Sequence, residues 1–321
     1  MRYELIIQHG TKLCYPPVVD GVTVEWNFKG QPGRLTFEVV KTASLEFEEG
    51  DAVRFSVNGK PFFYGFIFDK SRSGSTPKVV KITVYDQLYY FKNKDTYVYK
   101  DKTASALIRM IAEDFRLNLG VIEDTKYPLS RTEDDSSLFD ITQNALDLTM
   151  NATSNIYCLY DKVGKLTLTS IGNMKYGLVL DEDTVGDFDY KTSIAENTYN
   201  RIKLVYEDSE SGKREVFIAQ DGSKINKWGV LQFYEKIDDK SMAKQKANAM
   251  LSLYDCKTRT LSLKDVLGDE NVRAGTLLVV ILGLGDYNLS NYLLVNQVKH
   301  TFKDNQHLMD LKLRGGDNIV A

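Results

Sequence analysis

The sequence is poor in the residues that most often build metal sites and disulfide frameworks. Its 321 residues include three histidines and three cysteines, and Cys14, Cys158 and Cys256 lie far apart with no CxxC pair. So few histidines leave little room for a metal centre, and an odd, scattered set of cysteines indicates neither a zinc site nor a disulfide framework. This cysteine usage is typical of a reducing compartment.

Long apolar runs and a strong excess of one charge are also absent. The longest apolar candidate, Leu277–Leu282, is strand-sized and far short of the roughly 20 residues that span a bilayer. The N-terminal stretch is apolar only as far as Gln8, so no signal peptide is visible. Lys and Arg number 41 against 44 Asp and Glu, which argues against a nucleic-acid-binding protein. We therefore expect a soluble chain made in the cytoplasm, without specific nucleic-acid binding.

Aromatic residues, in contrast, are plentiful, with 19 Tyr and 15 Phe. They favour strands and contact surfaces. The first 95 residues hold six short β-branched or aromatic runs: Tyr3–Gln8, Val22–Phe28, Leu35–Val40, Ala52–Val57, Phe62–Phe68 and Val79–Tyr85. Turn signals such as Asn58-Gly59 separate them. This spacing predicts a small antiparallel β-barrel or sandwich over residues 1–95.

The period of the apolar residues changes after about residue 101. Apolar residues recur at helical spacing over Ala104–Phe115, behind Thr103 as a cap, and again from Leu138 to Leu148, behind a capping box that Ser137 begins. A hairpin, Ile156–Tyr160 and Leu166–Ser170, follows. We therefore expect an α+β insert of two helices and a hairpin over residues 96–194, ending in a polar loop.

The last part of the chain returns to strands and predicts a second β-barrel over residues 195–321. A helix at about residues 239–254 interrupts it. The expected strands are Arg201–Tyr206, Glu215–Ala219, Thr260–Lys264, Leu277–Leu282, Tyr292–Thr301 and Leu308–Leu313. The predicted fold class is therefore α+β and mainly β, with two antiparallel barrels that flank the insert.

The two ends of the chain are similar in the order of their parts. Gly50 precedes a strand, a turn, a second strand, a loop and a third strand, and Gly275 precedes the same series 225 residues later. Arg34 and Arg259, upstream of each, are also 225 residues apart. We interpret this as duplication of one β domain, although glycines followed by alternating residues also recur by chance in β proteins.

Residues for catalysis or metal binding are hard to find. His300 and His307 flank a turn and could face each other across a hairpin, but two imidazoles without a third ligand make a poor metal site. His9 ends a predicted strand. No serine lies in a GxSxG elbow, and no histidine is near a cysteine in sequence. The sequence therefore predicts no catalytic, cofactor-binding or metal-binding residues.

Two acidic runs, Glu133-Asp134-Asp135 and Asp181-Glu182-Asp183, are the candidates for a glycosidase pair of carboxylates. Both have simpler interpretations. The first comes just before a helix N-terminus, where the helix dipole favours negative charge, and the second falls in a polar, solvated loop.

The order of parts resembles the central baseplate hub of contractile phage tails and related injection machines. The likeness covers nearly the whole chain, and its best local carriers are the segment Ala104–Ser170 and the closing segment Asn296–Leu313. Length and make-up are most similar to the XkdQ/YqbQ-like hubs of Gram-positive prophages and phage-tail-like bacteriocins. These motifs are patterns of core residues rather than catalytic signatures.

This resemblance implies a structural, non-enzymatic homotrimer in the baseplate of a virion tail or tail-like particle. Three chains with two barrels each would give a pseudo-sixfold ring between a sixfold tail tube and a threefold spike. Two alternatives stay open at this point: a cell-wall hydrolase on a β scaffold, and a carbohydrate-binding tail-tip protein. The second would need exposed Trp or Tyr, yet the only tryptophans, Trp26 and Trp228, lie in strand-like contexts.

Overall fold

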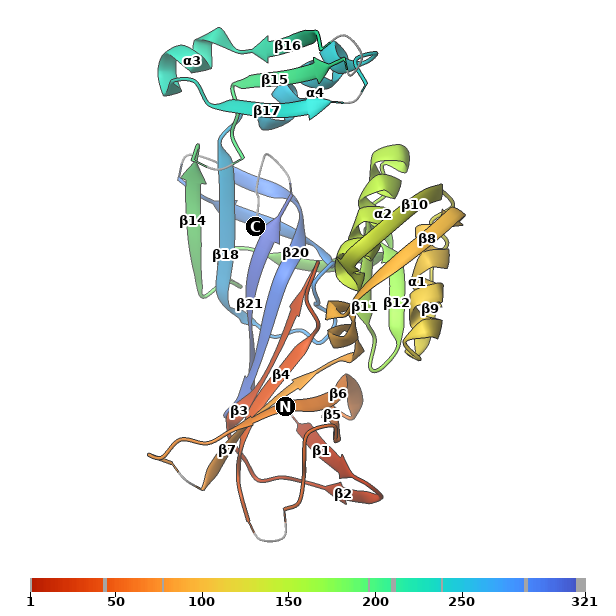
Figure 1. Ribbon diagram of the computed structural model, residues 1–321. Coiled ribbons are helices and arrows are strands. Elements are labelled where there is room, and N and C mark those ends of the chain that lie inside the picture. The colour runs from red at the N-terminus through yellow and green to blue at the C-terminus, as the bar shows by residue number, and fades with distance from the viewer. Residues whose placement is uncertain are drawn as a thin grey trace. The chain divides into compact units, whose positions relative to one another are not determined.

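The computed structural model describes residues 2–42, 45–76, 78–195, 197–208, 212–237, 239–285 and 288–315 (Figure 1). The chain divides into two compact units. Unit 1 consists of residues 1–188 and 262–313, and unit 2 of residues 189–261 and 314–321. Among the described residues, no helix is both long enough and apolar enough to cross a membrane.

All six strands predicted in the first 95 residues are present, joined by one short extra strand. They are β1 (Tyr3–His9), β2 (Lys12–Cys14), β3 (Val18–Asn27), β4 (Arg34–Val40), β5 (Ala52–Val57), β6 (Lys60–Ser71) and β7 (Val79–Tyr85). Asn58 and Gly59 have φ angles of +48° and +79°, and they close the predicted two-residue hairpin between β5 and β6. The strands lie in the order β3-β4-β7-β6-β5-β1-β2, and each neighbouring pair is antiparallel.

The four strands predicted near the C-terminus are also confirmed. They are β18 (Thr258–Leu267), β19 (Leu277–Gly283), β20 (Asn288–Lys303) and β21 (Gln306–Arg314). In the sheet they lie in the order β18-β21-β20-β19, which repeats the order β4-β7-β6-β5 of the first group. The matched order supports the duplication predicted from the sequence.

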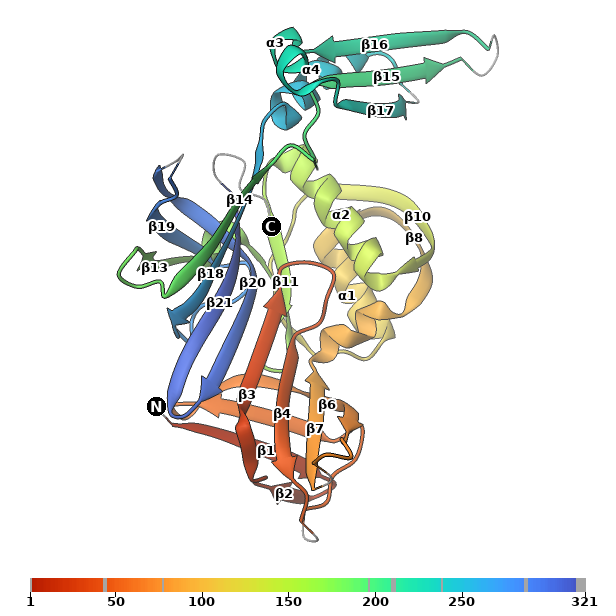
Figure 2. The ribbon, with the colours of Figure 1, turned by 90° about the vertical axis from the view of Figure 1, so that its left-hand side faces the viewer.

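The two strand groups do not close into separate barrels, and in this respect the sequence-based prediction is wrong. Within the described residues both belong to one sheet of order β14-β18-β21-β20-β3-β4-β7-β6-β5-β1-β2, with β19 paired to β20 and to β13. The cause is the length of β20. Its first half pairs with β19, and its second half, Gln297–Phe302, continues along β3 (Figure 2).

The strands β13 (Lys175–Leu180) and β14 (Asp187–Ser193) were not predicted. They flank the Asp-rich segment, so the polar loop is shorter than expected. β13 runs parallel to β19, whereas its counterpart in order, β1, runs antiparallel to β5. The two groups therefore differ at this edge.

The insert contains the two predicted helices, α1 (Ala104–Asp114) and α2 (Leu138–Thr153), and the predicted hairpin, β11 (Tyr157–Asp161) and β12 (Leu166–Ser170). Thr103 Oγ1 accepts from the Ala106 N–H at 3.2 Å, and Ser137 Oγ accepts from the Asp140 N–H at 3.1 Å, so both predicted caps are confirmed. The apolar faces of both helices share one core with the hairpin.

Three strands of the insert were missed. β9 (Leu119–Ile122) runs parallel to β12, and β8 (Lys94–Thr103) pairs with β10 (Pro128–Ser137) in a two-stranded ribbon. Two short 3-10 helices, η1 (Gln87–Lys92) and η2 (Ile171–Met174), complete unit 1.

Unit 2 is a three-stranded sheet with two helices. The strands β15 (Arg201–Glu207) and β16 (Arg214–Gln220) and the helix α4 (Ala243–Tyr254) confirm the prediction. The strand β17 (Gln232–Ile237), parallel to β15, and the helix α3 (Gly222–Trp228) were not predicted. Trp228 therefore ends a helix and does not lie in a strand, whereas Trp26 lies in β3 as expected.

Candidate functional site

The two histidines that the sequence placed across a turn do face each other. His300 in β20 and His307 in β21 are both buried, and Nδ1 of His300 lies 2.8 Å from Nε2 of His307. Nε2 of His300 lies 3.0 Å from the carbonyl oxygen of Val272. A carbonyl only accepts, so Nε2 of His300 carries the proton; its Nδ1 then accepts from the Nε2–H of His307.

This arrangement holds the two rings neutral. Burial, and secondarily the neighbouring His307, puts the pKa of His300 well below its usual range. Burial lowers the pKa of His307 to about 4. Among the described residues, neither ring belongs to a group of three metal-ligand side chains. The pair is best understood as a hydrogen-bonded element of the core.

An aromatic cluster surrounds the histidine pair where β20 runs along β3. Phe302 stacks on His307 at 4.2 Å between ring centroids, and Trp26 and Phe62 meet the edge of His300 at 5.3 and 5.1 Å. These residues come from β3, β6, β20 and β21, so the cluster joins strands of both groups. Aromatic pairs of this geometry each add about 0.5–1.5 kcal/mol beyond their area burial.

Arg273, in the loop before β19, connects this aromatic cluster to the insert. Its Cζ lies 3.8 Å from the ring centroid of Tyr160 and 5.1 Å from that of Trp26. Its Nη2 donates to the backbone carbonyl of Asp161 at 3.2 Å. One arginine therefore contacts β3 of the first strand group, β11 of the insert and the approach to β19.

Two buried carboxylates, Asp86 and Asp161, lie near this arginine. Asp86 accepts from the N–H groups of Gly33 and Leu88 at 2.9 and 3.0 Å. Asp161 accepts from the side-chain amide of Gln87 at 2.7 Å. Burial raises the pKa of both carboxyls, and the charge of Arg273 opposes that rise. Both carboxylates accept hydrogen bonds from neighbouring groups, whereas the buried Nε of Arg273 has no partner, and the cluster has the character of a structural junction.

The first acidic run does come just before the N-terminus of α2, as the sequence suggested, but its three residues belong to β10. Glu133 lies in β10 and is 5% exposed. It accepts from Arg131 Nε at 2.7 Å and from Asn144 Nδ2 at 3.3 Å. Glu133 is therefore a buried structural carboxylate.

The second acidic run does lie in a loop, and two of its side chains accept hydrogen bonds. Asp181 accepts from the N–H and hydroxyl groups of Thr184 at 3.1 and 2.9 Å. Glu182 accepts from the Gly283 N–H at 3.3 Å.

His9 lies beside two carboxylates. Its Nδ1 lies 2.8 Å from Asp51 Oδ2, and Glu48 brings a second carboxylate within 4.8 Å of these atoms. Asp51 Oδ2 also accepts from the Glu48 N–H at 2.7 Å. These bonds tie the end of β1 to the turn before β5, which accounts for the cluster structurally.

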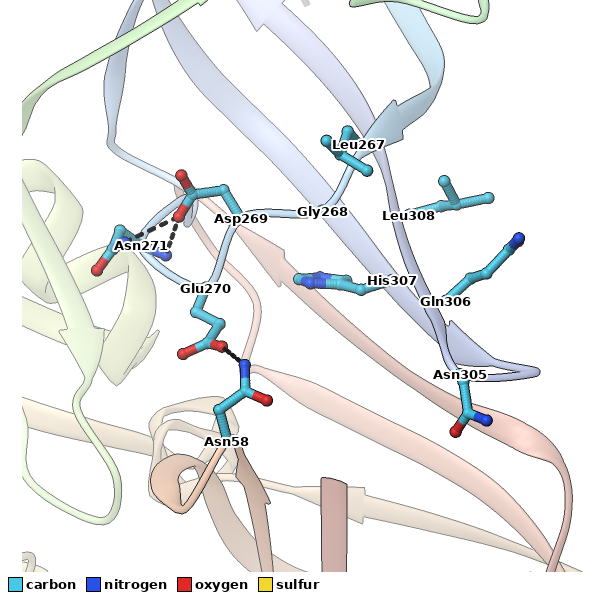
Figure 3. Close-up of a pocket in the computed structure, with 10 residues that line it drawn as sticks. All are labelled: Asn58, Leu267, Gly268, Asp269, Glu270, Asn271, Asn305, Gln306, His307 and Leu308. Atoms are coloured by element: carbon cyan, nitrogen blue, oxygen red, sulfur yellow. Dashed lines mark hydrogen bonds between the residues drawn. The ribbon is translucent and has the colours of Figure 1, made fainter. Parts of the chain in front are cut away.

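A pocket of about 680 Å³ opens beside the histidine pair (Figure 3). The residues that line it are Asn58, Leu267, Gly268, Asp269, Glu270, Asn271, Asn305, Gln306, His307 and Leu308. Glu270 accepts a hydrogen bond from Asn58, and Asp269 accepts from Tyr176 Oη at 2.8 Å. The ten described lining residues include no serine, cysteine or lysine that could act as a nucleophile, and both carboxylates are already hydrogen-bonded.

Cys158 and Cys256 offer no activated thiol either. Cys158 is buried, and desolvation raises its pKa to about 12, so it is a thiol at neutral pH. Burial also raises the pKa of Cys256. The described residues thus form a β scaffold whose polar groups hold strands and loops together.

This fold is that of phage tail proteins. The chain superimposes on the 43 kDa tail protein of prophage MuSo2 from Shewanella oneidensis with a TM-score of 0.71 at 14% identity, covering 99% of this chain and 100% of that one. It also resembles the c3393 component of the Escherichia coli type VI secretion system, with a TM-score of 0.54 at 11% identity over 99% of this chain and 78% of the other.

Sequence comparison then gives the family. The YqbQ-like family model matches residues 22–314, and the chain belongs to this family. It is 28% identical to YqbQ of Bacillus subtilis over 92% of this chain and 91% of the relative. It is 30% identical to XkdQ of the phage-like element PBSX of the same organism, over 82% of this chain and 81% of the relative. The resemblance stated from the sequence is confirmed.

Proposed function

We propose that this chain is the central hub of the baseplate in a contractile phage tail or a phage-tail-like bacteriocin, and that it acts structurally rather than as an enzyme. The observation that carries the proposal is the repeated strand order, β4-β7-β6-β5 and β18-β21-β20-β19. Kinship to a protein of a phage-like element and the tail-protein fold place this repeat in a tail context.

The repeated strand order explains why a hub would be built from two similar strand groups. Three copies of a chain with two equivalent strand groups form six similar modules while keeping threefold symmetry. Such a trimer can meet a sixfold tail tube on one side and a threefold spike on the other. The proposed partners are therefore two further copies of the chain, the tube protein, and the spike or other baseplate proteins.

The pairing of β20 with β3 suits this role because it fixes the two modules of one chain to each other. Six backbone-paired positions, from Gln297 opposite Asn27 to Phe302 opposite Val22, link them. A ring that transmits force between tube and spike needs modules that do not hinge freely. The proposed function keeps the domain limits that the sequence predicts, near residues 95 and 194.

Deletion of the gene from an inducible prophage, followed by electron microscopy of the particles, tests the function. We expect particles to be lost or to lack a baseplate, and complementation to restore them. Sedimentation of the complete chain should give a species of three times 36.5 kDa, either alone or with purified tube protein. Intact, infectious or bactericidal particles without the chain would overturn the proposal.

The cell-wall hydrolase and the carbohydrate-binding tail-tip protein gain no specific support from the described residues. The pocket beside the histidine pair is poor in nucleophiles, so it supports neither alternative. Trp26 is only 7% exposed, so it does not provide the exposed aromatic side chain that carbohydrate binding would need. A zymogram of the purified chain on peptidoglycan separates the first alternative from the hub, because clearing would require an enzyme.

A further inference from the structure

Unit 2 is a two-layer structure in which only one face of the sheet is covered by a helix. The helix α4 packs against β15 and β16, and this core contains Ile202, Leu204, Ala219 and Ala247. Alternation along the strands sends every second side chain to the opposite face. That opposite face has no covering element among the described residues of unit 2.

The uncovered face carries large apolar side chains on both outer strands. Ile218 of β16 and Tyr234 of β17 both lie opposite Lys203 of the central strand, and Val216 lies opposite Val205 in the next row. Val216, Ile218 and Tyr234 are 49%, 56% and 51% exposed. The sheet order is β16-β15-β17, so these exposed apolar side chains stand on either side of Lys203 and of Val205, which is only 4% exposed, and solvent alone does not favour them. We call these residues the β16–β17 face.

Basic residues lie between and around these apolar side chains. Arg201 and Lys203 of β15, Arg214 of β16 and Lys236 of β17 point to the same face by alternation, as does Glu207. Arg214 and Lys236 both approach Glu207, at 3.1 and 3.6 Å. The face therefore carries four cations against one carboxylate among the described residues of the three strands.

We propose that the β16–β17 face binds another protein of the particle, through a surface on that protein that combines apolar and acidic side chains. The proposal rests on the proposed function, since it needs a particle. Complementary charge steers such a contact and sets its register.

The same charge argues against symmetrical pairing of two copies of this chain through the face. Such an interface would bring eight cations together against two carboxylates, and like charges across an interface cost several kcal/mol. The occupant is accordingly a different protein with exposed carboxylates.

Particle assembly with matched variants tests the face. Ile218→Lys puts a charge on the β16–β17 face, and Leu253→Lys puts the same charge on a residue of α4 that is 62% exposed. We expect at least a tenfold loss of particles, counted by electron microscopy, for Ile218→Lys and none for Leu253→Lys. Circular dichroism and thermal melting of the purified chains should not distinguish the two variants.

Charge reversal gives a second, independent test. Lys203→Glu with Lys236→Glu should reduce assembly in the same way, whereas Lys244→Glu, at an exposed position of α4, should not. Hydrogen exchange should show β16 and β17 protected in purified particles relative to the free chain.

Several outcomes would overturn the proposal. One is normal assembly by Ile218→Lys in a strain whose deletion abolishes particles, which would leave the hub function standing. Another is a free chain that self-associates and becomes monomeric with Ile218→Lys, because the occupant would then be a second copy. If Ile218→Lys unfolds the chain, the charge-reversal pair decides the matter.

Discussion

Gly50 and Gly275 occupy the same structural position in the two strand groups. Their φ angles are +94° and +96°. Gly50 donates its N–H to the Ile67 carbonyl at 2.8 Å, and Gly275 donates its N–H to the Val295 carbonyl at 2.8 Å. The N–H of Ile67 in turn donates to the carbonyl of Asp51, and the N–H of Val295 donates to the carbonyl of Thr276. In each group this second bond returns to the residue after the glycine. Two sites 225 residues apart thus share one backbone arrangement, which gives the duplication a structural basis.

The two glycines differ in their surroundings, and this predicts unequal effects of alanine. A Cβ at Gly50 would meet open space, whereas a Cβ at Gly275 would lie 2.8 Å from Cys158 Sγ. We expect Gly50→Ala to cost about 1–2 kcal/mol from the left-handed backbone alone. Gly275→Ala should cost about 1–3 kcal/mol more, because the site is already filled. Urea unfolding of both variants measures the difference, and equal losses would contradict the prediction.

Acid should weaken unit 1 through its histidine pair. The pKa values of His300 and His307 are lowered in the folded state, the second to about 4. As pH falls below about 6.5, the unfolded chain binds protons that the folded chain does not, so stability is lost between pH 6.5 and about 4. The raised pKa values of Asp86 and Asp161 act in the opposite direction.

A histidine variant isolates this effect. His307→Gln keeps an amide that can donate to His300 and removes one titrating group, so its unfolding midpoint in urea should vary less between pH 7.5 and 4.5. His9→Gln, at the half-exposed histidine beside Asp51, serves as the control. A wild-type midpoint that does not fall between these pH values would refute the assignment.

Replacing Arg273 should lower the stability of the folded chain substantially. Arg273→Met deletes the bond to the Asp161 carbonyl and the charge that offsets two buried carboxylates, with an expected loss of about 2–4 kcal/mol. Arg273→Lys should restore little, because a lysine lacks the planar group that stacks on Tyr160. Arg72→Met, at an exposed residue, is the matched control and should change stability by less than about 0.5 kcal/mol. Thermal melting compares the three variants.

The two ends of α2 should respond in opposite directions. Ser137→Ala removes the N-cap bond and should cost about 1 kcal/mol. Ser154 at the C-cap has a φ of +59°, so Ser154→Gly should stabilise by about 1 kcal/mol because glycine takes this conformation without a Cβ clash. Differential scanning calorimetry should show Tm shifts of opposite sign, and shifts of the same sign would contradict both assignments.

Elements with a clear local pattern were predicted closely. β5 and β7 have the predicted bounds, and both insert helices begin at their predicted caps, because alternation and capping depend on residues near in sequence. β10 was missed because its sequence, PLSRTEDDSS, has little strand propensity. It forms a strand by pairing with β8, which is a contact outside its own sequence.

The sequence by itself determined the kind of protein: mainly β, repeated in its strand order, and related to phage tail proteins. Periodicity, turn residues and caps act over a few residues, so they can be read locally. Only the tertiary structure decided how the strands connect. β20 pairs with both β19 and β3, which replaces two closed barrels with one sheet, and it brings His300 against His307 beside Arg273. Such pairings depend on which distant strands bury their apolar faces together, and no local pattern specifies that.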